Sequence, residues 1–177
     1  MFAGRVRAIW RSVYSLVMFL NAEKVVAGFS VLLLLSACSE NLTPKDKDLL
    51  ENFKQHRTEL SRVVQMLGED RKLQALWPDS ITPKDAIDED RWNEYRRLMS
   101  SIGTRGIHAN LGKESEVMFR SDSLNYASYD KGYVYSEKML EPLKESLDLK
   151  RTEVPPYQTY YKHIEGNWYL YYENQSD

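Results

Sequence analysis

Three histidines, His56, His108 and His163, are the first side chains to consider for acid–base or metal chemistry. They stand far apart in the sequence, and none belongs to an HExxH motif or a close histidine pair. His56 falls on the apolar stripe of an expected helix, where a histidine is usually a hydrogen-bonded boundary residue rather than a ligand. The sequence therefore predicts neither a metal site nor a cofactor.

An acidic cluster, Asp85, Asp88, Glu89 and Asp90, has the oxygen ligands that calcium prefers. It lacks the glycine and the alternating spacing of a calcium loop. Acidic side chains at this density are also favoured in the first turn of a helix, because the helix dipole is positive there. We expect a solvated helix start.

Enzyme signatures are missing from the chain, which has no Gly-x-Ser-x-Gly elbow and no phosphate-binding glycine loop. Two carboxylates, or a histidine and a carboxylate, can still be assembled from distant strands without leaving a spacing pattern. A small envelope hydrolase thus stays an alternative. It predicts a deep pocket in which His108 or His163 meets Asp or Glu, but no catalytic residue is assigned.

Tyrosine is concentrated late in the chain, with ten of twelve tyrosines between Tyr126 and Tyr172. In the last expected strand, alternation places Trp168, Leu170 and Tyr172 on one face and Tyr169 and Tyr171 on the other. One of the two sets must face the core.

If the Trp168 set packs on the helices, Tyr169 and Tyr171, joined by Tyr160 and His163, would form an exposed face that binds protein or glycan. Whether Tyr160 or Tyr161 joins them depends on the hairpin register. The alternative is that tyrosine is simply a good strand residue.

A run of thirteen uncharged residues, Val25 to Ala37, precedes the only cysteine, Cys38. It is too short to cross a hydrocarbon core of about 30 Å as a helix but suits the apolar region of a signal peptide. Positive charge lies upstream at Arg5, Arg7, Arg11 and Lys24. The run ends in Leu35-Ser36-Ala37-Cys38.

These four residues resemble the lipobox of bacterial lipoproteins. The resemblance implies that residues 1–37 are a signal peptide, cut between Ala37 and Cys38, and that Cys38 carries acyl chains on its thiol and its new amino group. Two or more chains make membrane attachment effectively permanent. Translation from Met18 would give the same mature chain. A buried free cysteine is the alternative for Cys38.

An uncleaved membrane helix formed by residues 13–37 is a second alternative. It would place Glu23 and Lys24 near the bilayer centre, where a lysine costs about 2.5–3.5 kcal/mol on insertion scales. In the lipoprotein family, Asp after the cysteine retains the protein in the inner membrane, whereas here the residue is Ser39. We therefore expect a lipid-anchored protein of the bacterial cell envelope, on the periplasmic face of the outer membrane.

Charge and composition exclude several classes of protein. The 177 residues carry 24 Lys and Arg against 26 Asp and Glu, an ordinary globular balance. Removal of residues 1–37 leaves 140 residues with 20 basic and 25 acidic side chains. Such an acidic body does not suit a nucleic-acid binder. The expected partners are the membrane, through acyl chains on Cys38, and an envelope protein or cell-wall glycan.

The mature chain begins with a short polar tether, residues 38–45, and continues as one domain, residues 46–177. Thr43-Pro44 predicts the start of an amphipathic helix that ends at Gly68. Its apolar stripe is Leu49, Phe53, Leu60, Val63, Val64 and Leu67. A second helix is expected from Thr82-Pro83, with Asp85 in its first turn, to Gly103.

Short alternating runs after Arg105 predict strands. The candidates are Gly106 to Asn110, Glu116 to Ser121, Gly132 to Ser136, Gln158 to Ile164 and Trp168 to Glu173. Glu165-Gly166-Asn167 predicts a hairpin, and a helical turn is expected around Leu140 to Leu147. The pattern predicts an α+β fold in which an N-terminal helix pair packs on an antiparallel β-meander sheet. The favoured function is non-catalytic binding of an envelope component.

Overall fold

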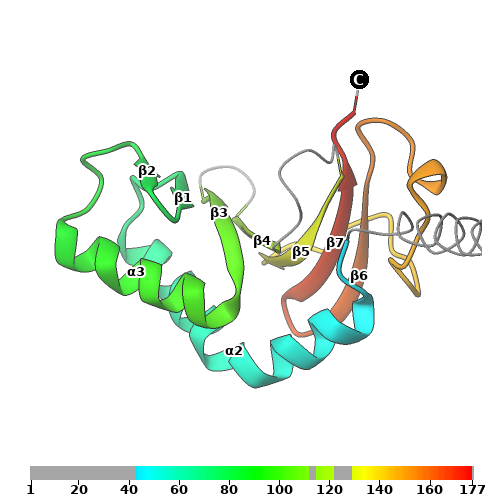
Figure 1. Ribbon diagram of the computed structural model, residues 1–177, viewed down its shortest axis with the longest axis horizontal. Coiled ribbons are helices and arrows are strands. Elements are labelled where there is room, and N and C mark those ends of the chain that lie inside the picture. Colours follow the sequence, from blue (N-terminus) through cyan, green and yellow to red (C-terminus); the bar gives the residue numbers. More distant parts are fainter. Residues whose placement is uncertain (1–42, 112–114, 122–128, 177) are drawn as a thin grey trace, which may run out of the picture. The chain divides into compact units, whose positions relative to one another are not determined.

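The computed structural model describes residues 43–111, 115–121 and 129–176 (Figure 1). The chain divides into two compact units, Met1–Glu40 and Asn41–Asp177, and all described residues belong to the second. The predicted signal peptide, Cys38 and most of the tether lie outside the described residues. Within the described ranges, no helix has the length and apolar content needed to cross a bilayer.

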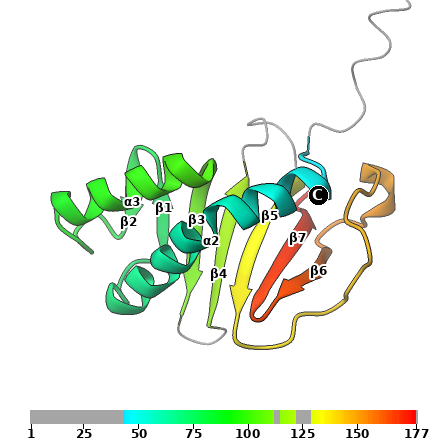
Figure 2. The same cartoon turned by 90° about the horizontal axis from the view of Figure 1, so that it is seen from below.

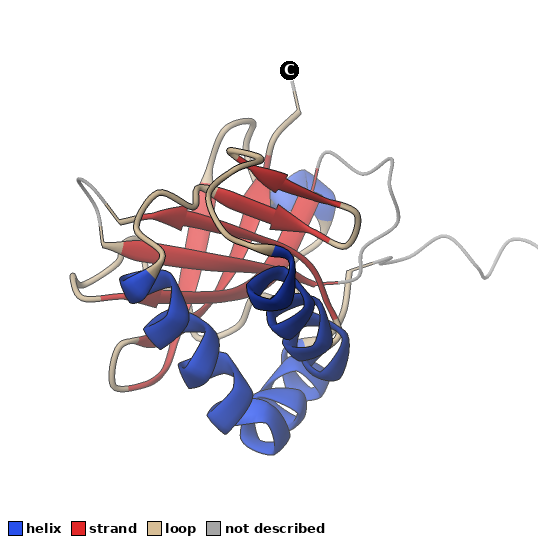
Figure 3. Ribbon diagram, turned by 90° about the vertical axis from the view of Figure 1, so that its left-hand side faces the viewer, coloured by secondary structure: helices blue, strands red, loops and turns tan. Residues whose placement is uncertain are grey.

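Two helices pack on each other and on one face of a seven-stranded antiparallel sheet (Figures 1 and 3). The helices are α2, Asp46–Glu69, and α3, Glu89–Ile102. The strands are β1 Ala75–Trp77, β2 Ser80–Thr82, β3 Thr104–Asn110, β4 Glu116–Ser121, β5 Tyr129–Ser136, β6 Thr159–Glu165 and β7 Trp168–Asn174, in the spatial order β2-β1-β3-β4-β5-β7-β6. The predicted α+β class is confirmed.

Helix α2 buries the face that the sequence periodicity predicted, with Val64 partly buried and the other five stripe residues buried. It begins at Asp46 rather than at Thr43-Pro44, and Lys45, at the N-cap, makes no side-chain cap. Instead, Asp148, far along the chain, accepts a hydrogen bond from the Asp46 N–H at 2.8 Å. A tertiary contact therefore sets the start of this helix.

Helix α3 begins later than predicted, at Glu89. Asp88 is its N-cap, and the Asp88 side chain accepts a hydrogen bond from the Arg91 N–H at 2.8 Å. The expected start, Thr82-Pro83, is wrong because Thr82 ends strand β2. Burial of Leu76 and Ile81 in a β1–β2 hairpin outweighed the local helix-start pattern. The helix ends at Gly103, as predicted, with φ of 75°.

The connection between β5 and β6, residues 137–158, runs around the β6 edge of the sheet, since β7 lies between these two strands (Figure 2). The helical turn expected around Leu140–Leu147 is not formed, and a 3-10 turn lies instead at Arg151–Glu153. Leu140 packs in the smaller core cluster and Leu147 in the main one. A single helical turn could not place the two side chains in both clusters. Between them, Leu143 pairs in parallel with Tyr161 of β6.

A buried ion-pair network fixes the start of α2. Lys131 of β5 is 1% exposed, and its Nζ lies 2.7 Å from Asp46 Oδ1 and 2.9 Å from Asp148 Oδ1. Lys162 of β6 reaches Asp46 Oδ2 at 3.0 Å, and the Leu147 N–H donates to the same oxygen at 2.9 Å. Burial alone would raise the pKa of Asp46, but these donors outweigh it and lower the pKa below its usual 3.8.

Asp46→Asn should destabilise the fold by about 2–4 kcal/mol at pH 7, because the buried Lys131 would then have one carboxylate beside it, that of Asp148, instead of two. The folded-state pKa of Asp46 is lower than its unfolded value. Its contribution is therefore complete above about pH 4 and is lost as the pH falls through the lowered pKa. Urea unfolding at pH 7 and pH 3 measures this difference, which should shrink at the lower pH.

The matched control is Asp48→Asn, in the same turn of α2 but exposed. It should change the free energy of unfolding by less than about 0.5 kcal/mol. Equal losses in the two variants would contradict the role assigned to Asp46.

A tight turn at Pro155–Gln158 precedes β6, with the Gln158 N–H donating to the Pro155 carbonyl at 3.3 Å. Pro156 and Tyr157 are its central residues, and Tyr157 has φ of 57°, as in a type II turn where glycine is preferred. The Tyr157 N–H is held by the Asn174 carbonyl at 2.8 Å, and its side chain is 70% exposed. The exposed ring therefore gives little packing in return for the backbone strain.

Tyr157→Gly should stabilise the folded domain by about 1 kcal/mol, because glycine occupies positive φ without the steric cost that a side chain adds. Urea unfolding of the two proteins at pH 7 measures the change. A loss of stability would show that the Tyr157 side chain contributes packing that exceeds the strain.

Candidate functional site

The sequence pattern assigned Tyr169 and Tyr171 to the opposite face of the sheet from Trp168, and this assignment is confirmed by the two separate core clusters. The prediction that they are exposed is wrong: Tyr169 is 6% exposed and Tyr171 is 0% exposed. Leu140, from the β5–β6 connection, covers them in a small second core with Val134. They do not form a binding surface in this structure.

The strand register places Tyr160 and His163, the other two residues of the predicted binding face, on opposite sides of the sheet. Tyr161 pairs with Tyr171, whereas Tyr160 pairs with Tyr172 and lies on the helix side of the sheet. His163 is exposed opposite Tyr169, with 5.1 Å between ring centroids. Its Nε2 lies 3.0 Å from the carbonyl of Gly166.

The histidine geometry expected of a hydrolase does not form among the described residues. His56 Nδ1 lies 3.9 Å from Glu59 Oε1, one turn along α2. His108 packs edge-on against Trp77. Within the described ranges, neither His108 nor His163 contacts a carboxylate at hydrogen-bond distance, and no cluster of three His, Cys, Asp or Glu could hold a metal ion.

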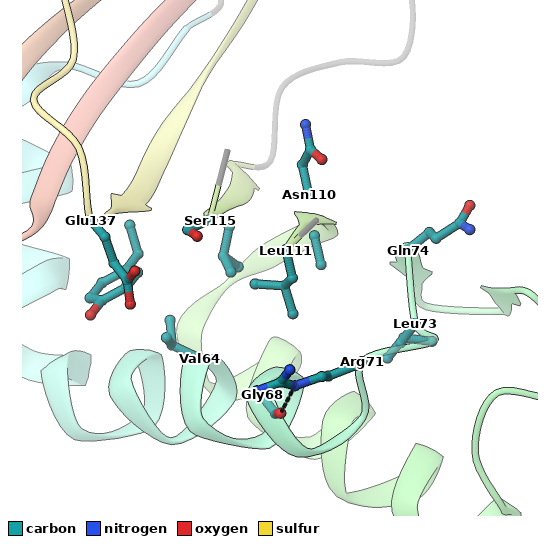
Figure 4. A pocket seen from close by; sticks show the side chains of 12 residues that line it. Val64, Gly68, Arg71, Leu73, Gln74, Asn110, Leu111, Ser115 and Glu137 are labelled. Carbon is teal, nitrogen blue, oxygen red and sulfur yellow. Dashed lines mark hydrogen bonds between the residues drawn. The ribbon is translucent and has the colours of Figure 1, made fainter. Parts of the chain in front are cut away.

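A cavity of about 930 Å³ lies between the second half of α2 and the ends of β3, β4 and β5 (Figure 4). We call it the α2–sheet cavity. Its walls are formed by Val64, Gly68, Arg71, Leu73, Gln74, Ala109, Asn110, Leu111, Ser115, Val117, Tyr135 and Glu137. It exists because α2 ends at Glu69 and the chain turns away to β1, which leaves the adjacent strand ends uncovered by the helix.

The inner wall of this cavity is apolar. Leu73 and Val117 are fully or almost fully buried in the main core, and Val64, Ala109 and Leu111 pack against that core while remaining partly exposed. This surface is continuous with the core of the domain. An apolar group placed there would therefore be removed from water at the edge of a rigid framework.

Two opposite charges border the cavity. Figure 4 shows Arg71, just after α2, on one side and Glu137, just after β5, on the other. Arg71 Nε donates to the Gly68 carbonyl at 3.3 Å, and both charged side chains are exposed. A ligand that enters the cavity thus meets a cation at one side and a carboxylate at the other.

No protein-family model, no characterised protein and no solved structure matches this chain. The functional interpretation consequently depends on the geometry of the site. The α2–sheet cavity combines partly exposed apolar side chains with polar ones, and a concavity that combines both can serve as a ligand-binding site. Arg71 and Glu137 border the cavity from opposite sides.

Sequence reasoning missed the α2–sheet cavity. Its lining comes from α2, the connector that follows it and three strands, so no spacing in the sequence connects these residues. The sequence indicates where the first helix ends. Which strand ends this leaves uncovered is known only from the order of the strands in the sheet.

Proposed function

We propose that this chain is a lipid-anchored bacterial envelope protein whose domain binds a segment of another envelope protein in the α2–sheet cavity. The observation that carries the proposal is the cavity itself, of about 930 Å³, with a wall of mixed apolar and polar side chains and the opposite charges of Arg71 and Glu137 at its borders. Its volume lies within the range of about 300–1,000 Å³ found for binding pockets. A non-catalytic role accords with this arrangement.

The anchor is supported by the lipobox-like Leu35-Ser36-Ala37-Cys38. Residues 38–45 would connect an acylated Cys38 to the buried Asp46, and eight residues span at most about 26–29 Å. The domain would therefore stay within that distance of the membrane surface at its point of attachment. Ser39 after the cysteine favours the periplasmic face of the outer membrane.

The cavity also indicates the character of the bound segment. Apolar side chains would occupy the wall formed by Val64, Leu111 and Val117, where they lose water contact. A carboxylate near Arg71 and a cation near Glu137 would fix the direction of the segment. A short amphipathic peptide with opposite charges at its two ends meets these requirements.

Replacement of the cysteine tests the anchor. Bacteria expressing the wild-type chain should incorporate labelled palmitate into it, and Cys38→Ser should abolish the label and release the protein from membranes, because only a thiol forms the thioether. Glu40→Gln, two residues away, should keep both the label and the membrane attachment. A wild-type protein without label would refute the lipid anchor.

Photo-crosslinking in intact cells tests the cavity. A photoreactive phenylalanine analogue at Leu111 should capture one protein partner reproducibly, whereas the same analogue at Gln55, exposed on α2 and outside the cavity, should not. Arg71→Glu should reduce the captured fraction at least fivefold, since it reverses one of the two orienting charges. The matched control is Arg97→Glu on α3, which is exposed and does not line the cavity.

Both charge reversals are surface changes and should alter the free energy of unfolding by less than about 0.5 kcal/mol. Thermal melting of each variant checks this point. Equal capture by the Arg71 and Arg97 variants, or equal capture from positions 111 and 55, would exclude the cavity as the binding site.

A further inference from the structure

The sheet face opposite the helices carries a second cluster of polar and aromatic side chains, formed by Trp77, His108, Arg120 and Asp130, which we call the Trp77 site. Trp77 lies on β1, His108 on β3, Arg120 on β4 and Asp130 on β5. None of them lines the α2–sheet cavity. The proposed function does not use these residues.

Gly106 leaves room for the Trp77 ring, and Gly132 allows the backbones of β4 and β5 to approach closely. Arg120 pairs with Gly106 of β3 on one side and Gly132 of β5 on the other. A Cβ on Gly106 would come within 2.5 Å of the Trp77 ring, and one on Gly132 would lie 2.0 Å from the Phe119 carbonyl oxygen. Trp77 therefore lies over bare backbone and approaches Arg120 across β3, with the Arg120 guanidinium carbon 5.5 Å from its ring centroid.

The charge of Arg120 is balanced inside the site. Its Nε lies 2.6 Å from Asp130 Oδ2, and the Tyr171 hydroxyl donates to the same oxygen at 2.7 Å. Burial and the nearby Asp130 carboxylate raise the pKa of Tyr171, so the hydroxyl keeps its proton. Arg120 and Asp130 therefore form a rigid pair without net charge.

His108 completes the surface as a neutral group. Its ring stands at 84° to the Trp77 ring, with 5.2 Å between the centroids. Partial loss of water contact and the Arg120 cation lower the pKa of His108 below its usual 6.5, although Asp130 and Glu173 oppose this shift. At neutral pH the imidazole offers one hydrogen-bond donor and one acceptor.

The polar groups of the site differ in exposure. Asp130 is 3% exposed, and its Oδ1 has no hydrogen-bond partner, which is costly for a buried carboxylate oxygen. Arg120 contacts Asp130 through Nε, and its side chain is 29% exposed. The accessible polar groups beside the half-buried Trp77 indole are therefore His108, which is exposed, and Arg120.

We propose that the Trp77 site binds a neutral saccharide. A sugar ring packs its C–H face on an aromatic ring such as Trp77, and its hydroxyls both donate to and accept from the neutral His108 imidazole and accept from Arg120. An anionic group gains little here, because Asp130 already neutralises Arg120. The wall formed by Trp77 and His108 is too polar to favour a purely apolar ligand.

Titration calorimetry tests this proposal with the full-length chain in detergent and tri-N-acetylchitotriose as the probe. We expect saturable binding that Trp77→Leu weakens at least tenfold. Trp92→Leu is the matched control, because Trp92 is also half-buried and stacks with an arginine, but on α3. It should leave the affinity unchanged within twofold.

His108 gives a second test that does not depend on a buried residue, since its side chain is exposed. His108→Leu should weaken binding at least fivefold, and His108→Gln, which keeps a donor and an acceptor, should weaken it less. Thermal melting confirms that each variant is folded. Crosslinking from Leu111 in the cavity should be unaffected, which separates the two sites.

Three results would overturn the proposal. The first is the absence of saccharide binding by the wild-type chain. The second is equal affinity in the Trp77→Leu and Trp92→Leu variants. The third is saturable binding of inorganic phosphate that displaces the saccharide, since this would make the cluster an anion site.

Discussion

The contact between Lys131 and Asp46 is the constraint on which the rest of the domain depends. A lysine that is 1% exposed must be surrounded by acceptors, so the first residue of α2 cannot leave β5 without exposing an unbalanced charge to the core. This contact sets where α2 begins. Helix α2 is kinked at His56, and its second half ends at Glu69, which leaves the strand ends beside the α2–sheet cavity uncovered by the helix.

Periodicity in the sequence was sufficient for the fold class. The apolar stripe of α2 and the alternation in β7 were both predicted correctly, since each element buries one face against a single layer. Local patterns failed where tertiary burial opposed them. Thr82-Pro83 has the form of a helix start, yet Ile81 beside it is needed in the core, and the segment became a strand. The prediction of an exposed tyrosine face was wrong for a similar reason. Leu140, in an irregular segment, packs over these tyrosines, and an irregular segment has no periodicity from which this contact could be predicted.

The two candidate sites lay beyond sequence reasoning for different reasons. The cavity is defined by the point where a helix stops over a sheet, which depends on the arrangement of whole elements. The Trp77 site depends on cross-strand neighbours, and its trace in the sequence is Gly106, inside a strand that would otherwise favour larger residues. Such a glycine indicates close approach, but the partner that approaches is known only from the register.

The position of β7 has a consequence for the order in which the domain can assemble. This strand follows β6 along the chain, yet it lies inside the sheet, between β5 and β6, and supplies Trp168, Leu170 and Tyr172 to the core. During synthesis from the N-terminal end, β5 therefore has no partner on this side until β6 and the turn after it have also appeared. Until then its backbone hydrogen-bonding groups form an open edge, and an open edge favours pairing with other chains.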